Sequence, residues 1–255
     1  MAESTLSLTY DEFRVSVGDY LGYGRTSGDW SGNAGDRIDE SVQSGYRQFL
    51  SAHDWTFLKP NTTLTTADGT GDYTAPDDFG GLQGPMTYAA NIGWAPVTQT
   101  GEADIRRLRM ANASTTSVSG KPYLAAVQVQ AGTGTASQKF KFLLYPEPDG
   151  AYVLTYRYSA LQNKLTSAAI FPLGGALYSE VILQSMLAVA ETRYNDEIRH
   201  HRQVYAEKLA QAIVQDGRLN QPEHLGRMID NSDLADIQRA HKESTSLTVN
   251  GTTIW

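Results

Sequence analysis

The sequence contains no cysteine and no apolar run long enough to span a membrane. Without cysteine, disulfides and thiolate metal sites are excluded, and the chain is compatible with a reducing cytoplasm. A transmembrane helix needs about 20 consecutive apolar residues, so none is expected. The first residues, Met1 to Thr5, have neither the basic region nor the apolar segment of a signal peptide. We therefore expect a soluble protein made in the cytoplasm, with no membrane partner.

Positive charge is also scarce. The 255 residues contain 21 Lys and Arg against 28 Asp and Glu, for a net charge of -7. A surface that holds nucleic acid tightly needs clustered Lys and Arg, because affinity depends on neutralising phosphates. The composition argues against a chain that grips DNA, although DNA could still pass an acidic surface without being held.

Signatures of catalysis and metal binding are missing as well. The five histidines include no pair at the spacing of three or four that a helical metal site requires. His200 and His201 are adjacent, so we expect one in an apolar stripe and the other in solvent. Asp77 and Asp78 fit a turn better than a carboxylate pair, since consecutive strand residues face opposite ways. We therefore expect no catalytic residue, no cofactor and no metal site.

The sequence also lacks the motifs of a phosphate-binding loop and of a hydrolase nucleophile elbow. The glycines between residues 22 and 35 do not follow a strand and lack the Lys-Ser or Lys-Thr of a phosphate loop. No Gly-x-Ser-x-Gly elbow supports a hydrolase, but the members of a Ser-His-Asp triad meet only in space. An undetected hydrolase is therefore kept as the last alternative.

What is present is organised around residues 174–216, a stretch without proline and without glycine after Gly175. Its apolar residues recur in steps of three and four, which predicts helix. Apolar residues surround most of the first half, whereas the second half has one stripe and a charged face. An unbroken helix would be about 60 Å long at ~1.5 Å per residue. We therefore expect either a break near Asn195 or cover from neighbouring subunits.

Two shorter helices are predicted before this stretch. Thr9 and Glu12 have the spacing of a capping box, so a helix should begin directly after Thr9. A glycine-rich loop over residues 22–35 follows, with Tyr23 and Trp30 as its aromatic contacts. The second helix should begin at Asp36 and end near residues 53–54.

From Trp55 the pattern changes to that of strands and turns. We expect strands within residues 56–66, from Tyr73, and at 105–110, 124–129, 140–144 and 151–158. Residues 67–72 should form a hairpin turn, residues 76–81 should end the next strand, and the last two strands should pair across residues 146–150. Strands at this spacing predict an antiparallel β-sandwich or small barrel.

Helices on both sides of the β-region predict an α+β fold with a discontinuous domain. We expect a helical domain of about four helices, formed by residues 1–53 and 166–243. An inserted β-domain should span residues 54–165, and residues 244–255 should form an extended C-terminal arm.

The order of several segments resembles a known family. Residues 55–57 (Trp-Thr-Phe), 72–79 (Asp-Tyr-Thr-Ala-Pro-Asp-Asp-Phe) and 152–158 (Tyr-Val-Leu-Thr-Tyr-Arg-Tyr) follow two short helices and precede an Ala-rich one, with a closing helix over 205–216. This arrangement is similar to the head-to-tail adaptors of tailed bacteriophages, which include podophage tail tubular protein A and siphophage head-completion proteins. The chain departs from the shorter members after Gly217, with a polar helix candidate at 233–242 and a threonine-rich end.

The resemblance implies a structural virion protein without catalytic residues. It would form a ring, with 12 subunits in this family, that docks on the portal protein in the neck of the virion. The ring would join the capsid to tail or nozzle proteins and leave a channel for duplex DNA without binding it specifically. The protein would be made in the cytoplasm of a bacterial host.

A ring requires heterologous interfaces, in which two different patches meet. The interface candidates are apolar residues of the long helical stretch and of the arm, namely Leu177, Val181, Leu183, Leu187, Tyr205, Leu247, Val249, Ile254 and Trp255. In the arm, Asn250-Gly251 is a hairpin signal, but so short a hairpin is marginal in water. We expect it to need a host surface on the portal or on the adjacent subunit.

Three alternatives besides a hydrolase stay open. The chain could be a monomer in which the β-domain covers the apolar helix. It could be a ligand- or carbohydrate-binding β-sandwich module of a phage structural protein, with Tyr88, Trp94 and Tyr123 as an exposed row of stacking platforms. For the arm, the alternative is that the last dozen residues have no fixed structure, which is common at termini.

Overall fold

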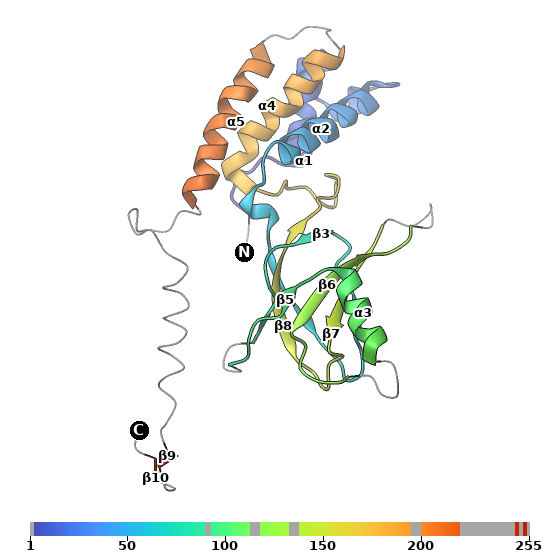
Figure 1. The fold of residues 1–255 in the computed structure, drawn as a ribbon. Helices are drawn as coiled ribbons and strands as arrows, with labels where there is room; N and C mark the ends of the chain where they lie inside the picture. The colour runs from blue at the N-terminus through green and yellow to red at the C-terminus, as the bar shows by residue number, and fades with distance from the viewer. Residues whose placement is uncertain are drawn as a thin grey trace. The chain divides into compact units, whose positions relative to one another are not determined.

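The computed structural model describes residues 3–89, 93–112, 118–132, 138–194 and 200–219, together with two short strands, β9 (Thr248–Val249) and β10 (Thr252–Thr253). The fold is α+β, as predicted (Figure 1). Residues 1–216 form one compact unit and Gly217–Trp255 a second. The domain boundaries expected within residues 1–216 stay a prediction.

Four helices share one hydrophobic core. They are α1 (Tyr10–Tyr20), α2 (Ala34–Ser51), α4 (Gly175–Tyr194) and α5 (His200–Leu219). The predicted capping box starts α1, because Glu12 Oε2 accepts the Thr9 N–H at 2.7 Å and Thr9 Oγ1 accepts the Glu12 N–H at 3.3 Å. Helix α2 begins two residues before Asp36 and ends before residues 53–54.

Of the two alternatives expected for this stretch, the break near Asn195 is the one observed, since α4 ends at Tyr194 and α5 begins at His200. The two helices lie side by side in antiparallel directions (Figure 1). His201 Nδ1 is 3.0 Å from Gln184 Oε1, and further along α5 Lys208 Nζ is 2.7 Å from Glu180 Oε1. Folding back in this way lets α5 cover α4 within one chain.

Helices α2 and α4 approach closely at Gly45. A Cβ atom on Gly45 would lie 2.4 Å from the Met186 Cα, so only glycine fits this crossing. Ser185 Oγ donates to the Gly45 carbonyl at 2.8 Å in the same place. The buried core around the crossing includes Phe13, Val17, Ile38, Val42, Phe49, Trp55, Ile182 and Met186.

Between α2 and α4 the chain forms two four-stranded sheets. The first contains β1 (Asn61–Thr65), β8 (Val153–Ala160), β3 (Phe79–Leu82) and β4 (Thr87–Tyr88). The second has the order β2 (Asp72–Thr74), β7 (Phe140–Tyr145), β6 (Leu124–Val129), β5 (Thr98–Gln99). Rings from the two sheets meet in one core, with Phe142 of β7 at 5.0 Å from Tyr156 of β8. The sheets therefore form a sandwich, one of the two forms predicted, and among the described strands the prediction of antiparallel pairing fails only for β5 and β6, which pair in parallel.

Helix α3 (Glu102–Asn112) packs against the other face of the second sheet (Figure 1). The strand expected at residues 105–110 is therefore wrong. Ile105 and Leu108 are one helical turn apart and pack together against Leu143 and Tyr145. Spacing of this kind over six residues does not separate a helix from a strand.

Four strand predictions also need correction. Strands β7 and β8 do not pair, because β7 pairs with β2 and β6 while β8 pairs with β1, β3 and β4. Residues 67–72 do not close a hairpin, since β1 and β2 belong to different sheets. The segment expected to end a strand, residues 76–81, contains the start of β3, whose Phe79 is buried. The strand expected from Thr56 begins only at Asn61, after a 3-10 turn at Thr56–Leu58.

Candidate assembly surfaces

Five exposed apolar side chains gather around the start of α4, in two segments that are far apart in the sequence. They are Leu6, Ile170, Phe171, Leu173 and Leu177, with exposed fractions of 80%, 36%, 37%, 39% and 47%. We call this set the apolar patch. Single exposed leucines are ordinary, whereas a contiguous apolar surface marks a site of interaction.

Hydrogen bonds hold the two segments of the apolar patch together. The Tyr10 N–H donates to the Ile170 carbonyl at 2.7 Å, and the Leu8 N–H donates to Ser179 Oγ at 3.1 Å. The Leu173 N–H donates to the Tyr46 hydroxyl at 3.0 Å. Burial raises the pKa of Tyr46 to about 12, so this hydroxyl stays neutral at physiological pH. The patch is therefore anchored to α1, α2 and α4.

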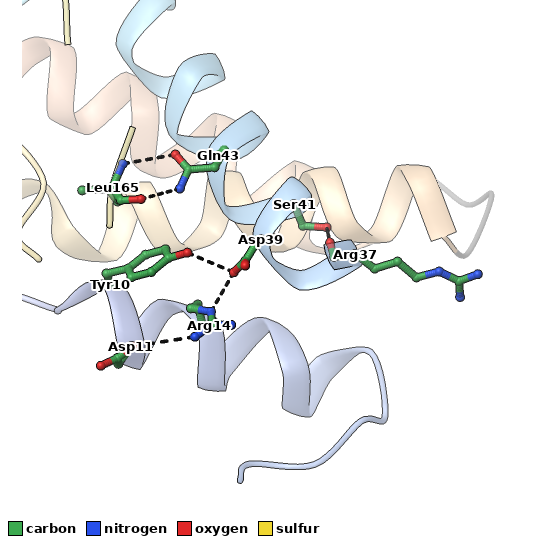
Figure 2. Close-up of polar contacts among 8 residues, drawn as sticks. All are labelled: Tyr10, Asp11, Arg14, Arg37, Asp39, Ser41, Gln43 and Leu165. Carbon is green, nitrogen blue, oxygen red and sulfur yellow. Dashed lines mark hydrogen bonds and ion pairs between the residues drawn. The ribbon is translucent and has the colours of Figure 1, made fainter. Parts of the chain in front are cut away.

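Side chains on one face of α2 fix the chain where it returns from the β-sandwich. Gln43 Nε2 donates to the Leu165 carbonyl at 2.7 Å, and Gln43 Oε1 accepts the Leu165 N–H at 3.2 Å (Figure 2). One turn before Gln43, Asp39 Oδ1 accepts from the Tyr10 hydroxyl at 3.0 Å and from Arg14 Nε at 2.7 Å (Figure 2). Helix α2 thus binds both the return segment and α1.

Asp216, near the end of α5, fixes the chain where it leaves α2. This carboxylate is 3% exposed and accepts hydrogen bonds from the Thr56 N–H at 3.3 Å, the Thr56 hydroxyl and the Tyr178 hydroxyl at 3.4 Å. His53 Nε2 lies 3.4 Å from the same carboxylate. Burial, reinforced by Asp216, raises the pKa of Tyr178 to about 12. Both crossings between helices and sandwich are therefore held by buried polar groups.

A cavity of about 530 Å³ lies where these crossings meet. We call it the junction cavity. Its walls come from α2, with Tyr46, Arg47 and Leu50, from the outgoing residues His53 and Leu58, and from residues 159–164. Arg47, Leu161 and Lys164 are exposed at this site.

The predicted interface residues fall into three groups. Leu177 is exposed within the apolar patch, and Leu183 is partly buried against the helical core. Val181, Leu187 and Tyr205 are buried in that core, with 7%, 8% and 5% exposed. The antiparallel packing of α5 and the close crossing of α2 provide the cover that seemed to need a neighbouring subunit.

The arm contributes only strand geometry. Thr248–Val249 and Thr252–Thr253 pair as antiparallel strands around Asn-Gly, as the sequence predicted. The side chain of Val249 and the whole of Leu247, Ile254 and Trp255 lie outside the described residues, as does the helix candidate at 233–242. A role for these four residues in an interface stays a prediction.

The aromatic residues of the alternative module do not form an exposed row. Tyr88 is 9% exposed, and its hydroxyl donates to the Pro122 carbonyl at 2.6 Å. Trp94 packs edge-on against Tyr88 at 5.0 Å and under Lys121 Nζ at 3.4 Å. Only Tyr123, at 50%, is an exposed ring. This arrangement is typical of a packed sheet edge rather than a stacking platform.

His200 and His201 lie as predicted, one in solvent and one in the apolar stripe. His201 is partly buried and its ring meets that of Tyr20 edge-on at 4.9 Å, whereas His200 is exposed. In the ranges that the structure describes, no group of three or more His, Asp or Glu could hold a metal ion. Asp78 accepts from the Tyr158 hydroxyl at 3.0 Å, while Asp77 pairs with Lys139 at 3.3 Å, so the two carboxylates have separate structural partners.

Sequence reasoning missed most of the apolar patch, along with Gln43 and Asp216. The only available signal was the run Ile170-Phe171-Pro172-Leu173. Its apolar residues lie beside a proline and two glycines, which are unfavourable in a strand, so the run could have been recognised as an apolar loop. Nothing in the sequence connected the segment of Leu6 to this run, because the hydrogen bond from Tyr10 to Ile170 joins residues about 160 positions apart.

Comparison with known proteins identifies one family. The family model described as SU10 adaptor protein matches residues 8–227, and no curated protein matches the chain. None of the described helices has the length and apolar character needed to cross a membrane. The match covers both the helices and the sandwich, so the chain belongs to the SU10 adaptor protein family, a family of structural bacteriophage adaptors and not a known class of enzyme.

Proposed function

We propose that the protein is a head-to-tail adaptor that assembles into a ring of 12 subunits beneath the portal protein. The ring joins the capsid to tail or nozzle proteins in the virion neck and leaves a channel through which duplex DNA passes. The protein has no turnover and no cofactor in this role. The C-terminal arm, with Leu247, Val249, Ile254 and Trp255, binds the portal or the adjacent subunit.

The observation that carries this proposal is the apolar patch. Five exposed apolar side chains lie in two segments that hydrogen bonds join near the start of α4, and their exposure is unfavourable for a monomer in water. A head-to-tail ring covers such a surface with a different surface of the next subunit. The family match supports the adaptor role, and the patch supports assembly through this end of α4.

Replacing Leu177 by Asp tests the proposal. Leu177 lies in the first turn of α4, where a carboxylate is favourable to the helix, so the subunit should stay folded. The same carboxylate should abolish ring formation, because burying it in an apolar interface costs several kcal/mol. Mass measurement of the purified protein, alone and mixed with portal rings, reports both states.

Two control variants make the result specific. Val129→Asp, at a side chain 54% exposed on β6, should assemble like the unchanged protein. Leu187→Asp, in the core, should fail to fold. If Leu177→Asp assembled normally, the patch would not be the interface, and a strictly monomeric protein that never binds a portal would contradict the adaptor proposal itself.

A further inference from the structure

The junction cavity carries two cations that have no carboxylate partner. Arg47 and Lys164 line it, and neither forms an ion pair with any residue that the structure describes. The acidic group in the lining is already neutralised, because Asp54 pairs with Lys59 at 2.6 Å. His53 faces the Asp216 carboxylate at 3.4 Å. The free charge of this cavity is therefore positive, in a chain whose net charge is -7.

The same cavity presents apolar surface beside the two cations. Leu50 and Leu58 contribute to its wall, and Leu161 is 57% exposed at its edge. The volume of about 530 Å³ is in the range of sites that bury a small ligand or a few side chains. Its chemistry fits a peptide in which carboxylates stand next to aliphatic side chains.

One stretch of this chain has that chemistry. Residues 228–237 (Met-Ile-Asp-Asn-Ser-Asp-Leu-Ala-Asp-Ile) contain Asp230, Asp233 and Asp236, each within one residue of Ile229, Leu234 or Ile237. The stretch lies outside the described residues. We propose that the junction cavity of one subunit receives residues 228–237 of the neighbouring subunit, with the aspartates paired to Arg47 and Lys164.

Docking of this kind makes each subunit both donor and acceptor, which is the head-to-tail pattern of a closed ring. The inference rests in this respect on the ring proposed above. Opposite charges also set the register of the docked segment and speed its encounter with the cavity. Binding of residues 228–237 in the junction cavity would then link neighbouring subunits through a contact that is separate from the apolar patch.

Cysteine cross-linking tests the proposal, since the full-length chain has no cysteine of its own. One preparation carries Leu161→Cys, and a second, with a different affinity tag, carries Leu234→Cys. Mixing and mild oxidation should give a disulfide-linked pair that carries both tags. Val129→Cys in place of Leu161→Cys is the matched control, because it is similarly exposed on β6 and should give no such pair.

Charge reversal shows whether the cations are responsible. Arg47→Glu with Lys164→Glu should lower the cross-linking rate about tenfold. Replacing Asp230, Asp233 and Asp236 by Lys in the other preparation should restore it. Both cations are exposed, so these variants should unfold at the same temperature as the unchanged chain.

Three outcomes would overturn the inference. The first is cross-linking by Val129→Cys that equals that of Leu161→Cys. The second is a disulfide that forms within one chain when Leu161→Cys and Leu234→Cys are combined. The third is a cross-linking rate that the charge reversal leaves unchanged while the affinity of the variant for duplex DNA falls. Ring formation is measured separately by mass. A chain that forms rings without the cross-link would contradict this inference and leave the adaptor proposal intact. A cross-linked pair that never forms rings would support the contact between the cavity and residues 228–237 and contradict the adaptor proposal.

Discussion

The side-chain amide of Gln43 makes the two hydrogen bonds to the Leu165 backbone that a neighbouring strand would otherwise make. This amide offers one donor and one acceptor, as a peptide group does, and both are used at 2.7 and 3.2 Å. Leu165 is 1% exposed, so its N–H and C=O could not find water if the amide were removed. At the residue scale, buried polar groups therefore decide how the chain returns to the helices.

Gln43→Ala should lower the free energy of unfolding by about 1–3 kcal/mol, because it leaves buried backbone groups unpaired. Gln48→Ala, at an exposed position of the same helix, should change it by less than about 0.5 kcal/mol. Urea unfolding of the two variants measures the difference. Equal effects would mean that water or a shifted backbone satisfies Leu165.

His201 should make the protein less stable in mild acid. Burial lowers its pKa in the folded state, an effect that Glu191 partly opposes and His200 reinforces. The folded state therefore binds this proton less readily than the unfolded state, whose histidine pKa is about 6.5. The stabilising effect is present above about pH 6.5 and is lost as the pH falls through the folded-state pKa.

His201→Gln should reduce this loss of stability below pH 6.5. The unfolding temperatures of the variant and of the unchanged chain are compared at about pH 7.5 and about pH 5.5. These two values lie on either side of the histidine pKa. His200→Gln, at an exposed position, should retain the original pH dependence. If both variants responded to pH like the unchanged protein, burial of His201 would not be the cause.

At the scale of elements, the crossing of α2 and α4 depends on one missing side chain. A Cβ on Gly45 would lie 2.4 Å from the Met186 Cα and 2.6 Å from its N, which are main-chain atoms that cannot move aside alone. Gly35, in the first turn of the same helix, has nothing within 4 Å of its would-be Cβ. The two glycines therefore separate the packing effect of a methyl group from its effect on helix propensity.

Gly45→Ala should destabilise the protein by about 3 kcal/mol or more, since overpacking that forces two helices apart lies at the upper end of such costs. Gly35→Ala should be neutral or stabilise by up to about 1 kcal/mol, because alanine favours the helix. Thermal unfolding compares them. A tolerated Gly45→Ala would show that the helices can separate without loss of the core.

At the scale of the whole molecule, charge balance bears on the passage of DNA. Many of the basic side chains already face carboxylates within the chain, among them Arg14, Lys59, Arg109, Arg193 and Lys208. A net charge of -7 opposes the counterion release on which affinity for DNA depends. In the ring proposed above, a channel with this property would let DNA move without retaining it.

The isolated protein should bind a short DNA duplex at physiological salt with a Kd no tighter than about 100 µM, the weak end of non-specific binding. Fluorescence anisotropy of a labelled duplex at several salt concentrations measures this. Tight binding that falls steeply with added salt would contradict the prediction and would indicate a basic channel.

Local features of this protein were determined by the sequence alone. The capping box of Thr9 and Glu12 and the periodicity of α4 and α5 depend on residues at most a few positions apart, whereas the break between the two helices was one of two open alternatives. The spacing of residues along the chain determines which of them interact over one helical turn, so these interactions can be predicted without knowing the fold. The α+β class follows from the order of such segments.

The tertiary structure decided which segments meet. Residues 105–110 suit a strand or a helix, and packing of Ile105 against the second sheet selects the helix. Strands β7 and β8 are neighbours in sequence, but both have an apolar face, and burying these faces against each other places them in opposite sheets. The apolar patch and the Asp216 contacts join residues more than 150 positions apart, where sequence spacing carries no information about distance in space.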